Sequence, residues 1–320
     1  MASTDLTTRL DDAVVARRPA SLWRDTIAAV LRQRSAIAGL SLLGFILLAA
    51  LLADVLAVYQ PTQTLFGVEG AQRLGAPCVH LLGCPQDQPQ FLMGIDQQNR
   101  DVFSRVVHGA RVSLRVGVVT VGMAILAGTF IGSVAGYVGG WLDNILMRVM
   151  DVLLAFPALI LAIFLVTAFD TLDLPFLGDP LFNAMLAIGI VAIPVYARVM
   201  RASVLSIRER DFVTASRALG ESGAGILFRR ILPNALTPLI VQGTLGIATA
   251  ILEVAALSFL GLGAQEPTAE WGSMIGQVRN LMFQAPHLVV FPGAALALSV
   301  LGFNLLGDGL RDALDPRLHR

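Results

Sequence analysis

Long stretches without charged residues recur along the chain, and they are its clearest structural signal. A helix needs about 20 mostly apolar residues to cross a hydrocarbon core of about 30 Å. Each stretch is too uniformly apolar for the alternating strands of a membrane barrel, so we predict six transmembrane helices. They cover Ser35–Ala53, Val116–Leu142, Val152–Phe169, Pro180–Ala197, Ile231–Leu252 and Asn280–Gly307.

Composition agrees with a chain that lies mostly in lipid. Of its 320 residues, 55% are hydrophobic and 14% are charged, and the mean hydropathy is +0.71. Soluble domains carry about 25% charged residues, so the fold class is an all-α integral membrane protein in a lipid bilayer. The formal net charge is zero and no basic stripe is interleaved with aromatic residues. Nucleic acid is therefore excluded as a partner.

Arginines indicate the orientation, because cytoplasmic loops carry an excess of basic residues. Six crossings place both arginine clusters and both termini in the cytoplasm. The polar leader is too long for an ordinary secretory signal, so we interpret the first helix as a retained anchor. The clusters are Arg9, Arg17, Arg18, Arg24, Arg32 and Arg34, and then Arg198, Arg201, Arg208, Arg210, Arg217, Arg229 and Arg230.

This orientation divides the chain into five parts. They are a cytoplasmic N-terminal segment (1–34), the first transmembrane helix (35–58), an extracytoplasmic loop with an interfacial helix (59–111), a five-helix core (112–307) that includes a cytoplasmic loop (201–233), and a cytoplasmic tail (308–320).

The extracytoplasmic loop holds the two cysteines, Cys78 and Cys84. Their closeness in an exported segment permits a disulfide. Free thiols and a metal site that includes His80 remain as alternatives, although three ligands at this spacing match no familiar site. Further along, Gln98–Val116 has the period of an amphipathic helix, which predicts an interfacial helix leading into the membrane.

Small residues and prolines shape the predicted spans. Gly128, Gly132 and Gly136 repeat at four-residue spacing, which lets a second helix approach closely. Prolines inside spans remove a backbone donor and favour kinks. These prolines are Pro157, Pro194, Pro238 and Pro292.

The cytoplasmic loop predicts a helix, a sharp turn and a second helix. Asp211 can cap a helix whose apolar stripe is Phe212, Ala215 and Leu219, and Gly220 can end it in a left-handed conformation. A second short helix then starts near Ser222 and stops near Pro233. The alternative is an ordinary amphipathic loop whose arginines meet anionic lipid headgroups.

This loop resembles the EAA motif of bacterial ABC importer permeases, in which Glu-Ala-Ala is followed by a glycine and then by Leu-Pro at fixed spacing. Thr214 and Ser216 replace the usual glutamate and second alanine, and Arg230 replaces an aliphatic residue. The resemblance implies a coupling helix that enters a groove on a separate ATPase. The implied coupling residues are Thr214, Ala215, Ser216, Leu219, Gly220, Leu232 and Pro233.

Most of the chain from about Leu92 onward is similar to the dipeptide and oligopeptide permease family. The matching stretches are Asp96–Leu114, Arg148–Ile163, Glu253–Ile275 and the tail Gly307–Arg317, with Asn99 where the family has glycine. The resemblance implies the type I ABC importer (MetI-like) fold in a plasma (inner) membrane. It also implies a second permease subunit, two ABC ATPase subunits that bind ATP and Mg²⁺, and an extracytoplasmic solute-binding protein.

Glu253 interrupts an apolar run, where an ionisable residue is expensive unless it is paired, protonated or facing water. It and Ser258 are our candidates for the translocation path or its gate, with a structural hydrogen bond of Glu253 as the alternative. Near the inner end of the third helix, Asp151 and Arg148 are expected to anchor that end. Further candidate residues on the outer side are Glu266, Glu270, Trp271 and Met274, in a surface that faces the binding protein or in a lipid-facing plug.

Other functional classes lack their signatures. The chain contains no lysine, so it has no P-loop of its own and no Schiff-base amine. It shows neither the paired charges nor the inverted repeats of a secondary transporter, and no nucleophile with its base for an intramembrane enzyme. We therefore expect a transport subunit that is not an enzyme and binds no cofactor. Its solute is expected to be a peptide, with nickel chelates, glutathione or oligosaccharides as alternatives.

Overall fold

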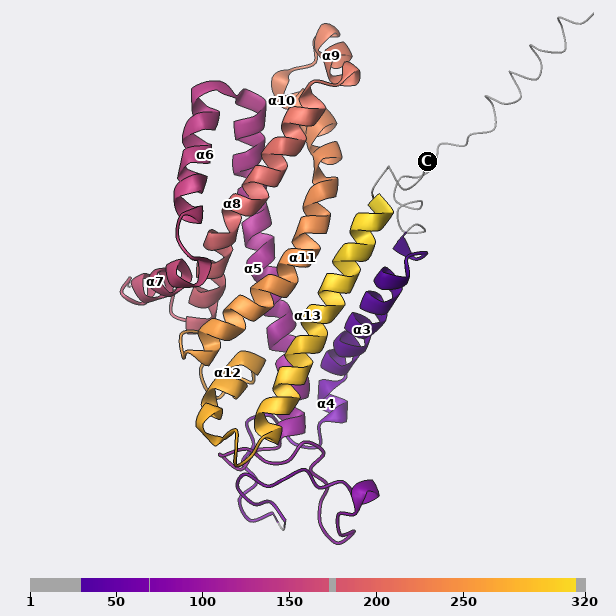
Figure 1. Cartoon of the computed structure of the whole chain (residues 1–320), viewed down its shortest axis with the longest axis vertical. Coiled ribbons are helices and arrows are strands. Elements are labelled where there is room, and N and C mark those ends of the chain that lie inside the picture. Colours follow the sequence, from indigo (N-terminus) through magenta and orange to yellow (C-terminus); the bar gives the residue numbers. More distant parts are fainter. Residues whose placement is uncertain (1–29, 69, 173–176, 315–320) are drawn as a thin grey trace, which may run out of the picture.

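The computed structural model describes residues 30–68, 70–172 and 177–314, and within them it contains helices, turns and isolated bridges but no β-sheet. Long helices run along the molecule and short ones join them (Figure 1). The α-helices are Arg34–Leu51 (α3), Ala53–Leu56 (α4), Val102–Val138 (α5), Gly140–Leu154 (α6), Ala158–Asp170 (α7), Pro180–Arg208 (α8), Asp211–Ala218 (α9), Gly223–Gly225 (α10), Leu232–Phe259 (α11), Trp271–Gln277 (α12) and His287–Leu314 (α13). Two 3-10 turns, His80–Leu82 (η1) and Arg279–Leu281 (η3), and a π-helical turn, Ile226–Ile231 (η2), complete the set.

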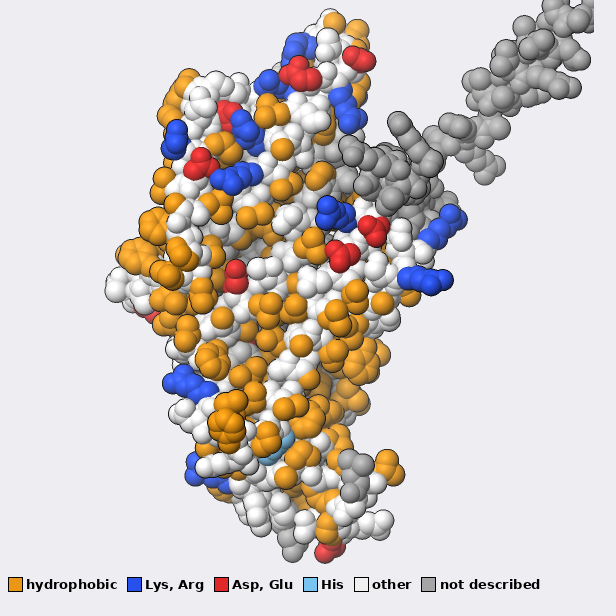
Figure 2. Space-filling view, in the orientation of Figure 1, with side chains coloured by type: hydrophobic (Ala, Val, Ile, Leu, Met, Phe, Trp, Pro, Cys, Tyr) orange, Lys and Arg blue, Asp and Glu red, His pale blue; other side chains and the backbone are white. Residues whose placement is uncertain are grey.

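Two ends of the molecule serve as landmarks. The short helices α9 and α10 lie at one end, here named the α9 end, and the irregular segment of residues 57–101 lies at the other, here named the loop end (Figure 1). Hydrophobic side chains cover the middle of the bundle in Figure 2, and charged side chains gather toward the α9 end. This distribution fits a bundle whose middle lies in hydrocarbon.

Membrane segments account for most of the helical residues. Among the described residues, five helices are long and apolar enough to span, namely α3, α5, α8, the continuous Gly223–Phe259 helix and α13, and the pair α6 and α7 makes a sixth segment if it counts as one. The predicted all-α, six-segment membrane fold is therefore confirmed. The predicted third helix, Val152–Phe169, is divided between α6 and α7, and the chain bends by 96° between them. Pro157 lies at the break, where it disfavours helical conformation in Phe156.

The helix α5 is one unbroken element of 37 residues. Asp101 caps its start and accepts hydrogen bonds from the backbone N–H of Ser104 at 2.8 Å and from its hydroxyl. The predicted interfacial helix, Gln98–Val116, begins at Val102 and continues without a break into the next span, since no proline or cap interrupts the run from there onward. At 1.5 Å per residue the helix is about 55 Å long, so it extends beyond a hydrocarbon core of about 30 Å.

The predicted close helix contact on α5 is present and involves α8. A Cβ atom on Gly128 would lie 2.6 Å from Cβ of Tyr196, and one on Gly136 would lie 3.0 Å from the carbonyl oxygen of Arg201. Gly132 meets the α8 backbone in the same way. Side chains at these positions would push the helices apart.

A similar seam joins the first and last described helices. A Cβ atom on Gly39 of α3 would lie 2.5 Å from the backbone nitrogen of Leu306, and one on Gly309 of α13 would lie 2.5 Å from Cβ of Ala36. α3 and α13 accordingly lie side by side along the bundle (Figure 1).

Several predicted boundaries fall inside helices. The border between residues 111 and 112 lies within α5, and the border between 307 and 308 lies within α13, which continues to Leu314. The first predicted membrane segment (35–58) contains α3 up to Leu51 and then α4. The leader before residue 30, with Arg9 to Arg24, and the last tail residues (315–320) lie outside the described part of the chain.

Candidate functional site

The first short helix predicted in the loop of residues 201–233 is present as α9, and its C-terminal end has the predicted form. Gly220 has a φ of +82°, a left-handed conformation that glycine adopts without penalty. The N–H of Gly220 donates to the carbonyl of Arg217 at 3.0 Å, and that of Glu221 donates to Ser216 at 3.1 Å. These two bonds form a Schellman motif, which satisfies the last carbonyls of the helix.

The start of α9 differs from the prediction. Arg210 occupies the capping position and makes no side-chain capping bond, while Asp211 is the first helical residue. The predicted cap by Asp211 is therefore wrong. A carboxylate in the first turn still interacts favourably with the helix dipole.

The predicted apolar stripe of α9 points away from the protein. Phe212 is 40% exposed and Leu219 is 88% exposed, and Ala215 between them is also exposed. Val213 instead faces inward, where it is fully buried against Ile226 and Ile231. One side of α9 thus attaches it to the bundle, and the other side presents apolar groups to the surroundings.

The remaining residues predicted for coupling lie on both sides of the turn. Thr214 is exposed and Ser216 is partly buried on α9, while the partly buried Leu232 and the exposed Pro233 begin α11. The structure brings the two groups to the same end of the molecule (Figure 1).

The second predicted short helix does not stop near Pro233. Ser222 caps α10 by accepting a hydrogen bond from the N–H of Gly225 at 3.2 Å, and the chain then continues through η2 into α11. A proline ring clashes with the carbonyl four residues earlier in an ordinary α-helix. The wider π-helical turn before Pro233 leaves room for that ring, so the helix passes through it.

Polar contacts fix the α9 end to the long helices. Arg208, at the end of α8, donates to the carbonyls of Gly136 and Tyr137 at 3.1 and 3.2 Å, where α5 ends. Arg230 of η2 pairs with Glu221 at 3.0 Å. These contacts join the end of α8 to α5, and join η2 to the turn that follows α9.

Two ion pairs join α6 to α8 near the same end. Arg201 forms a bidentate pair with Asp143, with N–O distances of 2.5 and 2.6 Å. Arg198 pairs with Asp151 at 2.6 Å, whereas Arg148 is exposed. Asp151 is paired near the end where the sequence predicts an anchor, whereas no local pattern in the sequence predicts the pairing of Asp143, which follows a glycine pair at a helix start.

Glu253 and Ser258 both lie on α11 but in different surroundings. Glu253 is partly exposed, and no hydrogen bond to its carboxylate occurs among the described residues. Ser258 is buried, and its hydroxyl accepts a hydrogen bond from the N–H of Ala264 at 3.1 Å. Ser258 also lines a hollow of about 550 Å³ at the loop end, between α11, α12 and the segment that joins them. We name this space the loop-end hollow.

The apolar residues of the short helix α12 lie neither on a surface that could face a binding protein nor on a lipid-facing plug, so both predictions for them are wrong. Trp271 is 1% exposed and Met274 is 6% exposed, so they form neither a lipid-facing plug nor a docking surface. The indole N–H of Trp271 donates to the carbonyl of Val106 at 3.0 Å. Glu266, before α12, is more exposed and pairs with the buried Arg100 at 3.1 Å.

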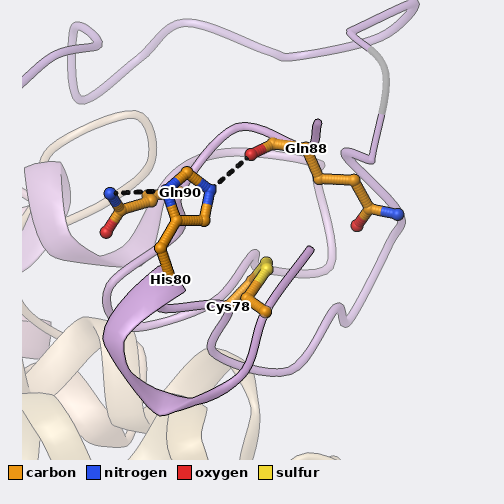
Figure 3. The surroundings of a disulfide bond; sticks show 5 residues. Cys78, His80, Gln88 and Gln90 are labelled. Atoms are coloured by element: carbon orange, nitrogen blue, oxygen red, sulfur yellow. Dashed lines mark hydrogen bonds between the residues drawn. A yellow bond between two sulfur atoms is a disulfide. The ribbon is translucent and has the colours of Figure 1, made fainter. Parts of the chain in front are cut away.

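The two cysteines are joined in a disulfide within the long loop (Figure 3). Their Cα atoms are 5.3 Å apart. The ring of His80 lies within hydrogen-bonding distance of the Gln88 carbonyl at 2.8 Å and of the Gln90 amide at 3.0 Å. Both ring nitrogens and both sulfurs are therefore occupied by protein contacts, and the described residues hold no group of metal-ligating side chains.

Comparison with known proteins places these features in a family. The model for "Binding-protein-dependent transport system inner membrane component" matches residues 128–320, and that for "N-terminal TM domain of oligopeptide transport permease C" matches residues 21–73. The dipeptide transport system permease protein DppC of Alkalihalophilus pseudofirmus is 43% identical over 93% of this chain and 91% of its own length. The DppC of Haemophilus influenzae is 41% identical over 90% and 92%, respectively.

Two further matches cover a smaller share of the chain. The glutathione transport system permease protein GsiD of Escherichia coli is 44% identical over 72% of this chain and 73% of its own. The structure described as "Crystal structure of an amino acid ABC transporter with histidines" aligns with a TM-score of 0.48 and 17% identity, over 64% of this chain and 91% of that one. The identities to the permeases and the match over residues 128–320 lead to one conclusion. The chain belongs to the family of binding-protein-dependent transport system inner membrane components.

Proposed function

We propose that the chain is the permease subunit of an ATP-driven importer that carries dipeptides and related short peptides. The observation that carries this proposal is α9, a capped helix that is fixed to the bundle through Val213 and exposes Phe212 and Leu219. Such a helix suits a groove on a separate protein, because burial of its exposed side chains provides binding energy. The relatives named as dipeptide permeases favour a peptide as the solute.

The proposed partners follow from this mechanism. Two ABC ATPase subunits, which hold ATP and Mg²⁺, receive the coupling helices of this chain and of a second permease. An extracytoplasmic binding protein delivers the solute, and closure of the ATPases switches the path between its two access states. The proposed coupling residues are Thr214, Ala215, Ser216, Leu219, Gly220, Leu232 and Pro233.

We place the α9 end in the cytoplasm, together with the N- and C-termini. Support comes from arginines at that end, including Arg198, Arg201 and Arg208, because cytoplasmic loops carry an excess of basic residues. The loop end then faces the extracytoplasmic side, where a disulfide between Cys78 and Cys84 persists.

The coupling role is tested by matched substitutions at the two ends of the molecule. Leu219→Glu places a charge on the exposed stripe of α9, and Leu81→Glu places one on a leucine that is 93% exposed in the long loop. We expect Leu219→Glu to abolish retention of the ATPases on a tagged permease in mild detergent, and Leu81→Glu to retain them. Equal retention by both variants would refute the coupling role.

The solute is tested separately by uptake into membrane vesicles that contain the complete transporter and its binding protein. A labelled dipeptide should accumulate only with ATP inside the vesicles. An unlabelled tripeptide with ordinary α-peptide bonds should compete, whereas the γ-linked tripeptide glutathione, a nickel chelate and an oligosaccharide should not. Uptake of a competitor in place of the peptide would reassign the solute without affecting the coupling role.

A further inference from the structure

Glu270 is a buried residue at the capping position of α12, where it is only 2% exposed. Its two oxygens accept hydrogen bonds from the backbone N–H groups of Gly272 at 2.9 Å and Ser273 at 2.8 Å. Burial of a charge is expensive unless donors replace water. The backbone donors of α12 supply part of that replacement, and Glu270 thereby caps the helix.

Groups on two longer helices supply the rest. The hydroxyl of Ser113 on α5 donates to the carboxylate at 3.5 Å, and the hydroxyl of Ser258 on α11 is one of the groups that lower the pKa of Glu270. Ser258 in turn accepts from the N–H of Ala264, and Ser113 accepts from the N–H of Trp271 at 3.4 Å. Burial raises the pKa of Glu270, and its hydrogen bonds oppose that shift by stabilising the charged form. One side chain thus joins α5, α11 and α12.

The choice of glutamate is informative because capping alone does not require it. The preferred capping residues are Asp, Asn, Ser and Thr, whose shorter side chains reach the first backbone N–H groups of a helix. Glu270 has an extra methylene, and its carboxylate meets donors on α5 and α11 as well as those of α12. We interpret the extra reach as the reason for its presence.

The helix that Glu270 holds is a wall of the loop-end hollow. Ser273, Gly276 and Gln277 of α12 line this space together with Ser258 and Phe259 of α11. α12 lies directly against α11, since a Cβ atom on Gly276 would be 2.7 Å from the carbonyl oxygen of Phe259. A shift of α12 by a fraction of a side chain would therefore change the shape of the hollow.

We propose that Glu270 is a positioning residue for transport, whose buried carboxylate ties α12 to α5 and α11 and so sets the opening of the hollow through which solute enters. The identification of the hollow as the solute entrance rests on the proposed import function. The contacts by which Glu270 joins the helices do not depend on that function.

Two variants separate the tie from simple capping. Glu270→Asp keeps a preferred capping residue but shortens the reach toward Ser113 and Ser258. The double variant Ser113→Ala and Ser258→Ala leaves Glu270 and its backbone bonds in place and removes the donors on the longer helices. Glu270→Ala removes both cap and tie, and serves as the reference for complete loss.

The opening of the hollow can be measured without transport. Asn280→Cys places a thiol on the lining of the hollow, and the two native cysteines are paired with each other. In the complete transporter, we expect Glu270→Asp and the double variant to change the modification rate of this thiol by a membrane-impermeant maleimide by about tenfold, as the loss of one to two buried hydrogen bonds allows.

Uptake measurements complete the test. Both variants should lower the maximal rate of peptide uptake, while the half-saturating peptide concentration and the retention of ATPases stay unchanged. If Glu270→Asp labels and transports like its parent, Glu270 is only a cap and the inference is overturned. If Glu270→Asp does not accumulate in the membrane, the double variant decides in the same way. Altered labelling in a transporter that carries no peptide would leave the positioning role intact and refute the import proposal.

Discussion

α9 and α12 are short helices in comparable places, yet they treat their apolar side chains in opposite ways. α9 joins α8 to the Gly223–Phe259 helix and leaves Leu219 in the open, whereas α12 lies between α11 and α13 and buries Trp271 completely. A helix with an exposed apolar face can bind another protein through that face. A helix whose apolar side chains are all buried is packed into the bundle and forms part of its structure. Short amphipathic segments between spans therefore differ in role according to which molecule covers them.

The largest effect expected from this comparison is at Trp271. Trp271→Ala removes a fully buried indole and its bond to Val106, and should lower the free energy of unfolding by about 3–5 kcal/mol. Trp141→Ala is the matched control, because that side chain is 73% exposed on α6. Thermal unfolding of the two purified variants in detergent measures the difference. Similar midpoints for both would show that α12 is not a packed wall.

A smaller loss is expected where α12 touches α11. Gly276→Ala introduces a methyl group 2.7 Å from the Phe259 carbonyl oxygen and should cost about 1–3 kcal/mol. Gly122→Ala on α5 is the control, since no atom lies within 4 Å of the added Cβ atom there. Unfolding in detergent should show a loss for the first variant alone. An unchanged midpoint for Gly276→Ala would mean that the two helices can separate freely.

At Gly220 the effect on function should exceed the effect on stability. Gly220→Trp forces a side chain into a left-handed conformation at a cost of about 1–2 kcal/mol, which disturbs the end of α9. The protein should still reach the membrane, but uptake and retention of the ATPases should be lost. Gly220→Asn, which tolerates this conformation, should keep both. Normal uptake by the tryptophan variant would show that the α9 turn is not needed for coupling.

The smallest stability effect is expected on the exposed side of α9. Leu219→Ser should change the free energy of unfolding by no more than about 0.5 kcal/mol, because nothing in the bundle covers that side chain. Val213→Ser on the same helix should cost about 1–3 kcal/mol, since its hydroxyl would be buried without a partner. Unfolding of both variants provides the measurement. Equal losses would mean that α9 is covered on both sides.

Features governed by neighbouring residues in the sequence could be predicted. The apolar spans could be predicted from the local composition of each stretch. Gly220 ends α9 as predicted, because the need for a left-handed residue after a helix is a local one. Gly128 and Gly136 approach α8 for a similarly local reason, namely the absence of side chains on one face of α5.

Features that depend on contacts between residues far apart in the sequence could not be predicted from it. The sequence predicts a surface position for Trp271, because the residue that accepts its indole hydrogen bond, Val106, lies 165 positions earlier in the chain. Asp143 forms an ion pair with Arg201, 58 positions away in the sequence, and no local pattern predicts that pair. The bend at Pro157 was anticipated as a kink, but its size of 96° depends on how α7 packs against α8.

The π-helical turn η2 also determines a direction in space. An α-helix advances by about 100° per residue around its axis, so a turn that holds an extra residue rotates everything on one side of it relative to the other. η2 lies between α9 and the body of α11. The number of residues in η2 therefore affects the direction, about the axis of α11, in which Phe212 and Leu219 point away from the bundle. Deletion of a single residue within 226–231 would rotate that direction by about 100°.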